Sequence, residues 1–207
     1  VRISGASPQS TYFLSAGYLE DTGIIPNSGF QRFTARMNAD YQVNNRIKVG
    51  SSFSYANTNS LSPRDQSGSS SGNLFYISNM IAPIYPLYVR DAAGNIMTDS
   101  HGFTMYDYGD ATEANFVRAF MNQSNPASAI ALNKSLLKND MFSGNFTAAA
   151  ELYDGLKATA KVAVGYVGVR YQSTLNPYYG QFANMGGQAQ VEADRMFTLN
   201  QQYLLTY

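Results

Sequence analysis

The stretch 30–41, FQRFTARMNADY, decides the fold because its residues alternate strictly in polarity. One parity is apolar and holds Phe33, Ala35, Met37, Ala39 and Tyr41. The other parity is polar and holds Arg32, Thr34, Arg36, Asn38 and Asp40. Since successive side chains of a β-strand point to opposite faces, this period of two predicts a strand with one apolar and one polar face.

Six further stretches share this strand character, and they cover residues 1–6, 11–20, 47–57, 136–152, 156–174 and 191–207. Each combines aromatic or aliphatic residues on one parity with small or polar residues on the other. The sequence therefore predicts an all-β protein of about seven antiparallel strands.

The connections alternate in length as regularly as the strands alternate in polarity. Short turns at 7–10, 42–46 and 153–155 separate longer segments at 21–29, 58–135 and 175–190. Outer-membrane β-barrels have short periplasmic turns and long extracellular loops. We therefore predict a segment of a transmembrane β-barrel, with 58–135 as a long extracellular loop. The alternative is a soluble antiparallel sheet with one wet face, which would also alternate in polarity.

The composition narrows the function classes. Charged residues make up 14% of the 207 residues and balance to a formal charge of zero, which disfavours a nucleic-acid partner. The absence of cysteine excludes disulfides, thiolate metal sites and cysteine nucleophiles. No apolar run is long enough for a transmembrane helix. The abundance of tyrosine and phenylalanine is typical of strands.

The charged residues of the strands test the barrel prediction. Those on the polar parity are Arg32, Arg36, Asp40, Lys48, Glu151, Lys157 and Lys161. Glu20, Arg170 and Arg195 break the pattern, and each lies near a long loop. A basic residue at mid-membrane costs roughly 2–4 kcal/mol, so we expect these three to lie above the lipid.

Both ends of the sequence suggest a segment of a longer chain, because it begins at Val1 without methionine and ends at Tyr207 within a predicted strand. We expect the seven strands not to be stable alone. Their two open edges and their lipid-facing side would be unsatisfied in water.

Several motifs together resemble the SusC/RagA family of TonB-dependent transporters. They are ISGAS at 3–7, TYFLSAGYL at 11–19, GIIPNSGFQRF at 23–33, RMNAD at 36–40, KVG at 48–50 and SY at 54–55. GNF at 144–146 with YDGLK at 153–157 is similar to another hairpin of the family. The resemblance covers residues 1–57 well and 136–174 loosely, and it does not extend to the long loop.

This resemblance implies a larger protein. Residues 1–207 would be part of one barrel domain of about 22 strands, whose plug domain and other strands lie outside this chain. The family imports oligosaccharides or peptides across the outer membrane of Gram-negative, Bacteroidota-like cells. Its partners are a SusD-like surface lipoprotein, which acts as a lid, and the TonB complex, which engages another part of the protein. No cofactor is implied.

Two sets of residues are candidates for binding. The loop tyrosines suit the apolar faces of sugar rings, and they are Tyr85, Tyr88, Tyr106, Tyr108, Tyr178 and Tyr179. They can equally form a loop core or a protein interface. The second set faces the lumen or the plug, and it comprises Arg32, Arg36, Asn38 and Asp40.

The sequence carries no catalytic constellation, so we predict that the protein is not an enzyme. His101 is the only histidine, and its neighbours Asp107, Asp110 and Glu113 match no known cation-binding loop, so no metal site is predicted. Within the long loop we expect a short helix at 71–81 and a small hairpin around 91–95. The alternatives for function are a passive porin, a surface-adhesin barrel and a soluble glycan-binding module.

Overall fold

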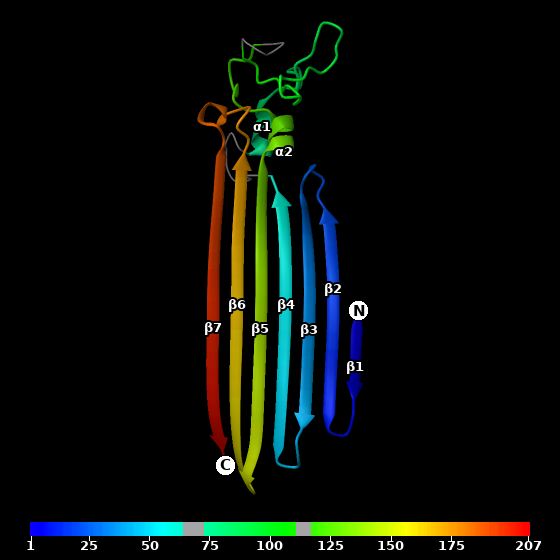
Figure 1. The fold of residues 1–207 in the computed structure, drawn as a ribbon, viewed down its shortest axis with the longest axis vertical. Coiled ribbons are helices and arrows are strands. Elements are labelled where there is room, and N and C mark those ends of the chain that lie inside the picture. Colours follow the sequence, from blue (N-terminus) through cyan, green and yellow to red (C-terminus); the bar gives the residue numbers. More distant parts are fainter. Residues whose placement is uncertain (64–72, 111–116) are drawn as a thin grey trace.

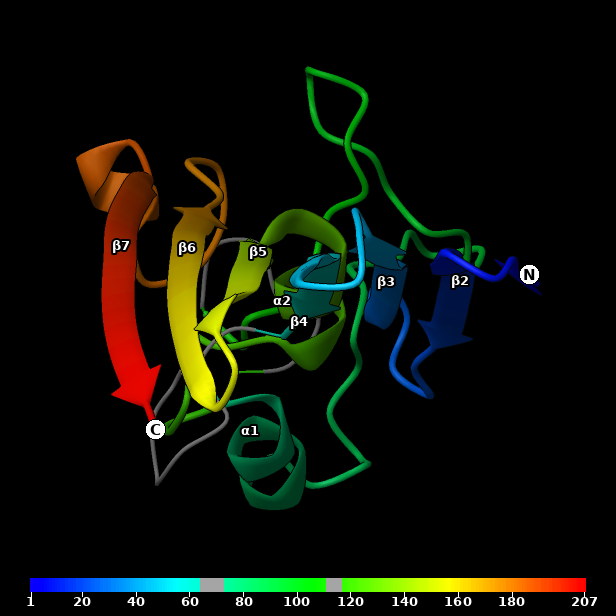
Figure 2. The same ribbon diagram turned by 90° about the horizontal axis from the view of Figure 1, so that it is seen from below.

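A computed structural model of the protein describes residues 1–63, 73–110 and 117–207. Seven strands form one antiparallel sheet in sequence order (Figure 1). Their bounds are β1 Arg2–Ala6, β2 Ser10–Thr22, β3 Gly29–Gln42, β4 Ile47–Ser62, β5 Lys134–Tyr153, β6 Leu156–Leu175 and β7 Gln188–Thr206. Viewed nearly along the strands, they form a single layer (Figure 2). Within the described residues the sheet stays open, with β1 and β7 at its edges. The prediction of a seven-stranded antiparallel barrel segment is confirmed at this level.

Three short turns lie at one end of the sheet, and the long connections lie at the other (Figure 1). The described residues of the long connections form two helices, α1 Leu74–Met80 and α2 Pro126–Leu132, and the 3-10 turn η1 Ala183–Met185. No helix among the described residues is long and apolar enough to cross a membrane. All three long connections therefore meet at the same end of the sheet, which we call the loop end.

The strands next to the longest connection extend farther than the alternation predicted. β4 continues to Ser62 and β5 begins at Lys134, so the connection comprises residues 63–133 and not 58–135. Thr58 pairs with Asn139, and Ser62 pairs with Ser135. The side chains at these positions are mostly polar, so their polarity does not alternate and did not indicate a strand. The backbone hydrogen bonds between the strands form regardless of side-chain polarity.

The register gathers the apolar parity of all strands on one face. Met37 of β3 pairs with both Leu14 and Phe53, and this row continues across the sheet to Leu199. Phe53 and Phe146 meet edge to face, with ring centroids 5.1 Å apart. These side chains lack a covering layer, since Leu199 is 51% exposed and Tyr203 is 72% exposed. Such a surface is unfavourable in water but suits lipid.

The opposite face is polar and carries short hydroxyl and amide side chains. Ser54 and Ser143 share a hydrogen bond of 3.3 Å between their Oγ atoms. Asn145 donates through Nδ2 to the Oγ of Ser52, also at 3.3 Å. This side of the sheet has the character of a water-filled barrel interior.

The packed core of the described residues lies in the long loop and not in the sheet. Its buried apolar side chains all fall between residues 73 and 110, and they are Leu74, Ile77, Ile81, Val89, Tyr106 and Tyr108. The helix expected at 71–81 is observed as α1, although residues 71 and 72 lie outside the described part. Asn73 caps it by accepting a hydrogen bond from the Tyr76 backbone, and the helix ends before Pro83.

The predicted hairpin around residues 91–95 is also present. Arg90 and Ile96 form a β-bridge, and Oδ1 of Asp91 accepts hydrogen bonds from the backbone N–H groups of Ala93 and Asn95. Gly94 adopts a φ of 87°, which a residue without a side chain tolerates.

Candidate functional site

The three long connections are tied to one another at the loop end through α2. Asn27 in the β2–β3 connection donates through Nδ2 to the carbonyl of Ile130, at 3.1 Å. Asn176 in the β6–β7 connection donates through its backbone N–H to Oδ1 of Asn133, the C-cap of α2, at 3.0 Å. The loops therefore form one assembly and not three independent segments.

Asn125 holds this assembly together from the start of α2. Its Oδ1 accepts hydrogen bonds from the backbone N–H groups of Ala127 and Ser128. Its Nδ2 donates to the carbonyls of Leu87 and Asp107, both at 2.8 Å. With 2% of its surface exposed, Asn125 is a buried amide whose donors and acceptor are all used.

Arg118 fixes the chain segment that precedes α2. Its guanidinium donates to four backbone carbonyls, those of Tyr108, Phe120, Met121 and Ser124, at distances between 2.7 and 2.9 Å. It is 3% exposed, and its burial lowers its pKa. Charge-assisted hydrogen bonds are among the stronger ones in proteins, so this residue keeps the loop in one conformation.

Four tyrosines form a continuous chain of ring contacts between two of the loops. The ring of Tyr106 lies 5.6 Å from that of Tyr88 and 5.8 Å from that of Tyr179. Tyr108 stacks on Tyr179 with an interplanar angle of 9°. Tyr106 and Tyr108 are each only 7% exposed, and burial raises the pKa of Tyr108 to about 12. These two rings therefore support the loop from inside.

A second aromatic group lies at the surface. Tyr178 is 51% exposed, and its ring lies 5.2 Å from that of Phe103 and 5.9 Å from that of His101. The neighbouring Tyr179 donates its hydroxyl to Oδ2 of Asp99 at 2.7 Å, and this bond is the main reason why the pKa of Asp99 is lowered. We call Tyr178 and Phe103 the surface aromatic pair.

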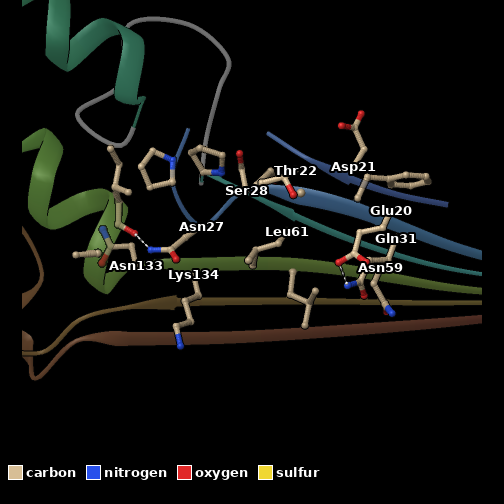
Figure 3. A pocket seen from close by; sticks show the side chains of 18 of the residues that line it. Glu20, Asp21, Thr22, Asn27, Ser28, Gln31, Asn59, Leu61, Asn133 and Lys134 are labelled. Atoms are coloured by element: carbon tan, nitrogen blue, oxygen red, sulfur yellow. Dashed lines mark hydrogen bonds between the residues drawn. The ribbon is translucent and has the colours of Figure 1, made fainter. Parts of the chain in front are cut away.

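A groove of about 780 Å³ runs along the loop end between the β2–β3 connection and α2 (Figure 3). Its polar lining includes Glu20, Asn27, Gln31, Asn59, Asn133, Lys134 and Lys138. Glu20 accepts a hydrogen bond from Gln31 at 3.0 Å within it (Figure 3). Gln31, Asn59 and Lys138 belong to the parity of the apolar face, so the groove lies on the outer side of the wall.

The chain is similar in sequence to TonB-dependent receptors. TonB-dependent receptor P3 of Formosa agariphila is 28% identical to the chain over 214 aligned residues, which cover 98% of the chain and 19% of P3. TonB-dependent receptor P26 of the same organism is 30% identical over 97 residues, or 46% of the chain and 9% of P26. TonB-dependent receptor P39 of that organism is 35% identical over 48 residues, which cover 23% of the chain and 5% of P39. No family model matches the chain.

The chain is homologous to the TonB-dependent receptors. These are outer-membrane β-barrel proteins, so the apolar face is the lipid side and the polar face is the lumen side of a barrel wall. The chain spans only 19% of the length of P3, and the described strands form an open part of such a wall.

The four residues predicted to face the lumen lie together on the polar face of β3. Arg36 pairs with Ser15 and Ser54, and Asp40 pairs with Thr11 and Gly50. A side chain at Gly50 would lie 2.7 Å from Oδ1 of Asp40, so the glycine leaves room for this carboxylate. Contact between a plug domain and these four residues, Arg32, Arg36, Asn38 and Asp40, stays a prediction.

The six predicted loop tyrosines fall into three sets. Tyr106 and Tyr108 are buried, Tyr88 and Tyr179 are partly covered in the same chain of rings, and Tyr178 is exposed. Tyr85 lies apart, against Phe120 and beneath the Arg118 guanidinium.

Arg118 and Asn125 were not predicted as important, although an asparagine directly before a proline is a signal for a helix start.

The residues considered for a cation site do not come together. Asp107 is 2% exposed and accepts a hydrogen bond from the Gly109 backbone, whereas His101 lies at the surface, 3.9 Å from Asp99. Glu113 lies outside the described residues. In the part of the chain that the structure describes, no three histidine or acidic side chains gather as possible metal ligands.

Proposed function

We propose that this chain forms part of the wall and the outer loops of a SusC-type TonB-dependent importer for large nutrients, with oligosaccharides or peptides as substrates. Homology supports nutrient import in general. The observation that carries the finer proposal is the surface aromatic pair, which is exposed on a loop assembly that is otherwise rigidly tied together.

The chemistry of the loop surface suits a sugar. Tyr178 and Phe103 come from different loops, and their rings are inclined by only 32°, so together they offer an apolar platform. Asp99 and His101 lie beside it and can accept or donate hydrogen bonds to hydroxyl groups. Binding sites commonly combine apolar walls with a few polar groups that fix orientation.

The proposed partners follow from the proposal that the chain is part of a SusC-type importer. A SusD-like surface lipoprotein would cover the loop end, and the TonB complex would supply energy through parts of the protein other than this chain. A passive porin would share the barrel wall. The dependence of uptake on the proton gradient distinguishes the two, since a porin conducts without it.

The test measures ligand binding by the receptor purified from outer membranes, with a ladder of linear oligosaccharides and a peptide pool of matched size as probes. We expect Tyr178→Ala combined with Phe103→Ala to weaken binding by about thirtyfold, the usual effect of removing about 2 kcal/mol from a binding hot spot. Tyr153→Ala is the matched control, because Tyr153 is 73% exposed at the opposite end of the sheet. Equal affinities for the double variant and the unaltered receptor would contradict the proposal.

A further inference from the structure

The lipid side of the sheet changes character toward the loop end. One row of the register carries aromatic side chains across four strands, and they are Tyr55, Phe142, Tyr166 and Phe197. On these four strands the next row toward the loops has no large apolar side chain and holds Asn57, Asp140, Gly168 and Arg195. Aromatic residues mark the level of the headgroups in outer-membrane barrels, so the polar rows begin where lipid headgroups lie.

Three cationic side chains gather just beyond the aromatic row. Lys138 of β5 lies directly opposite Arg170 of β6, and Arg195 of β7 lies diagonally next to Arg170. All three are exposed. Like charges in directly opposite positions destabilise a sheet, so the arrangement favours an anion between them. We call these three residues the cationic patch.

The acidic residues on this face do not neutralise the patch through ion pairs. Asp140 accepts hydrogen bonds from the Tyr55 hydroxyl and from Nδ2 of Asn57, both at 2.8 Å. Among the described residues, the side chains of the cationic patch have no hydrogen-bond or ion-pair partner. Asp140 is therefore held mainly by neutral donors, with a smaller electrostatic contribution from Lys138. The patch as a whole keeps its capacity to bind an external anion.

The patch is continuous with the groove of Figure 3. Lys138 lines the groove and also faces Arg170, so it joins the two features. On its other side the groove offers the amides of Gln31, Asn59 and Asn133, which suit hydroxyl groups. Cations beside a row of amides match a ligand that carries both phosphate and sugar.

We propose that the cationic patch and this groove bind the headgroup of a phosphorylated glycolipid in the outer leaflet. Its phosphates lie between Lys138, Arg170 and Arg195, its sugar hydroxyls lie along the groove, and its acyl chains follow the apolar rows below. A glycerophospholipid would satisfy the cations and leave the amides of the groove unused. The proposal rests on the orientation of the wall in the membrane and not on the nutrient that the receptor carries.

The test uses the receptor purified from its own outer membrane and reconstituted in nanodiscs that contain lipopolysaccharide. Bound lipid is measured by native mass spectrometry. A basic residue near an anionic membrane surface contributes about fivefold in affinity, so the triple variant K138Q/R170Q/R195Q is expected to bind roughly a hundredfold more weakly. The matched control is K157Q/K161Q, which removes charges from the lumen side of β6 and should leave lipid binding unchanged.

Three results would overturn the proposal. The first is that the triple variant retains the glycolipid as well as the unaltered receptor does. The second is that a dephosphorylated glycolipid binds as tightly as the phosphorylated form. The third is that phosphatidylglycerol displaces the glycolipid at equal concentration. Loss of a co-purifying protein with unchanged lipid would make the patch a protein interface. If the triple variant does not assemble, Arg170→Gln is compared with Arg170→Lys, and only the first should lose lipid.

Discussion

Replacing Val162 by arginine tests which face of β6 meets the lipid. The apolar parity of β6 runs from Ala158 to Tyr166, nine residues that match the length needed to cross the apolar band. Val162 lies four residues from either end of this run. At about 3.3 Å per residue and a tilt of about 45°, an arginine there starts roughly 9 Å from each boundary.

The expected cost follows from that depth. Arginine at the bilayer midplane destabilises a barrel by roughly 2–4 kcal/mol, or about 30- to 700-fold in the folding equilibrium constant. The neighbouring Ala163 points to the lumen side, so Ala163→Arg is the matched control and should cost less than about 1 kcal/mol. Unfolding of the receptor by guanidinium in lipid vesicles measures both values. A cost for Ala163→Arg equal to or above that for Val162→Arg would refute the assignment of faces.

Three further predictions concern the loops and turns. Asn125→Ala removes four buried hydrogen bonds and should destabilise the loop assembly by about 2–4 kcal/mol, detected as faster proteolysis of residues 117–133. The pKa of Asp99 is held below 3.8 mainly by the Tyr179 hydroxyl, so their contact stabilises the loop above about pH 3.8 and is lost as the pH falls further. Tyr179→Phe should reduce this acid dependence in hydrogen exchange, and the backbone hydrogen bonds from Phe103 and His101 should retain the remainder. Gly155 has a φ of 86°, so Gly155→Ala should cost about 1–2 kcal/mol in guanidinium unfolding, whereas Gly165→Ala should be tolerated.

The sheet could be predicted because each strand obeys a local rule. The alternation in 30–41 predicted β3, which the structure extends by one residue at each end, to Gly29–Gln42. A lipid-facing wall makes such alternation strict, since every apolar side chain must share one side. The rule fails where lipid ends. Thr58 to Ser62 belong to β4, but four of these five side chains are polar, so their polarity does not alternate.

The loop assembly could not be predicted in the same way. Asn125 contacts Leu87 across 38 positions, and Asn176 contacts Asn133 across 43. Such hydrogen bonds depend on how distant segments fold together and leave no periodic trace in the sequence. For the same reason, the sequence could not distinguish Tyr108, which supports the loop from inside, from Tyr178, which lies on its surface.

The most direct test of the barrel-wall assignment is a cysteine scan of β3, which is convenient because the chain contains no cysteine of its own. Single cysteines at positions 33 to 40 carry a spin label, and electron paramagnetic resonance measures their access to oxygen, which dissolves in lipid, and to a water-soluble nickel complex. A barrel wall with lipid on its apolar side predicts high oxygen access at Phe33, Ala35, Met37 and Ala39 and high nickel access at Thr34, Arg36, Asn38 and Asp40. Equal nickel access at both parities would contradict it and indicate a sheet with water on both sides.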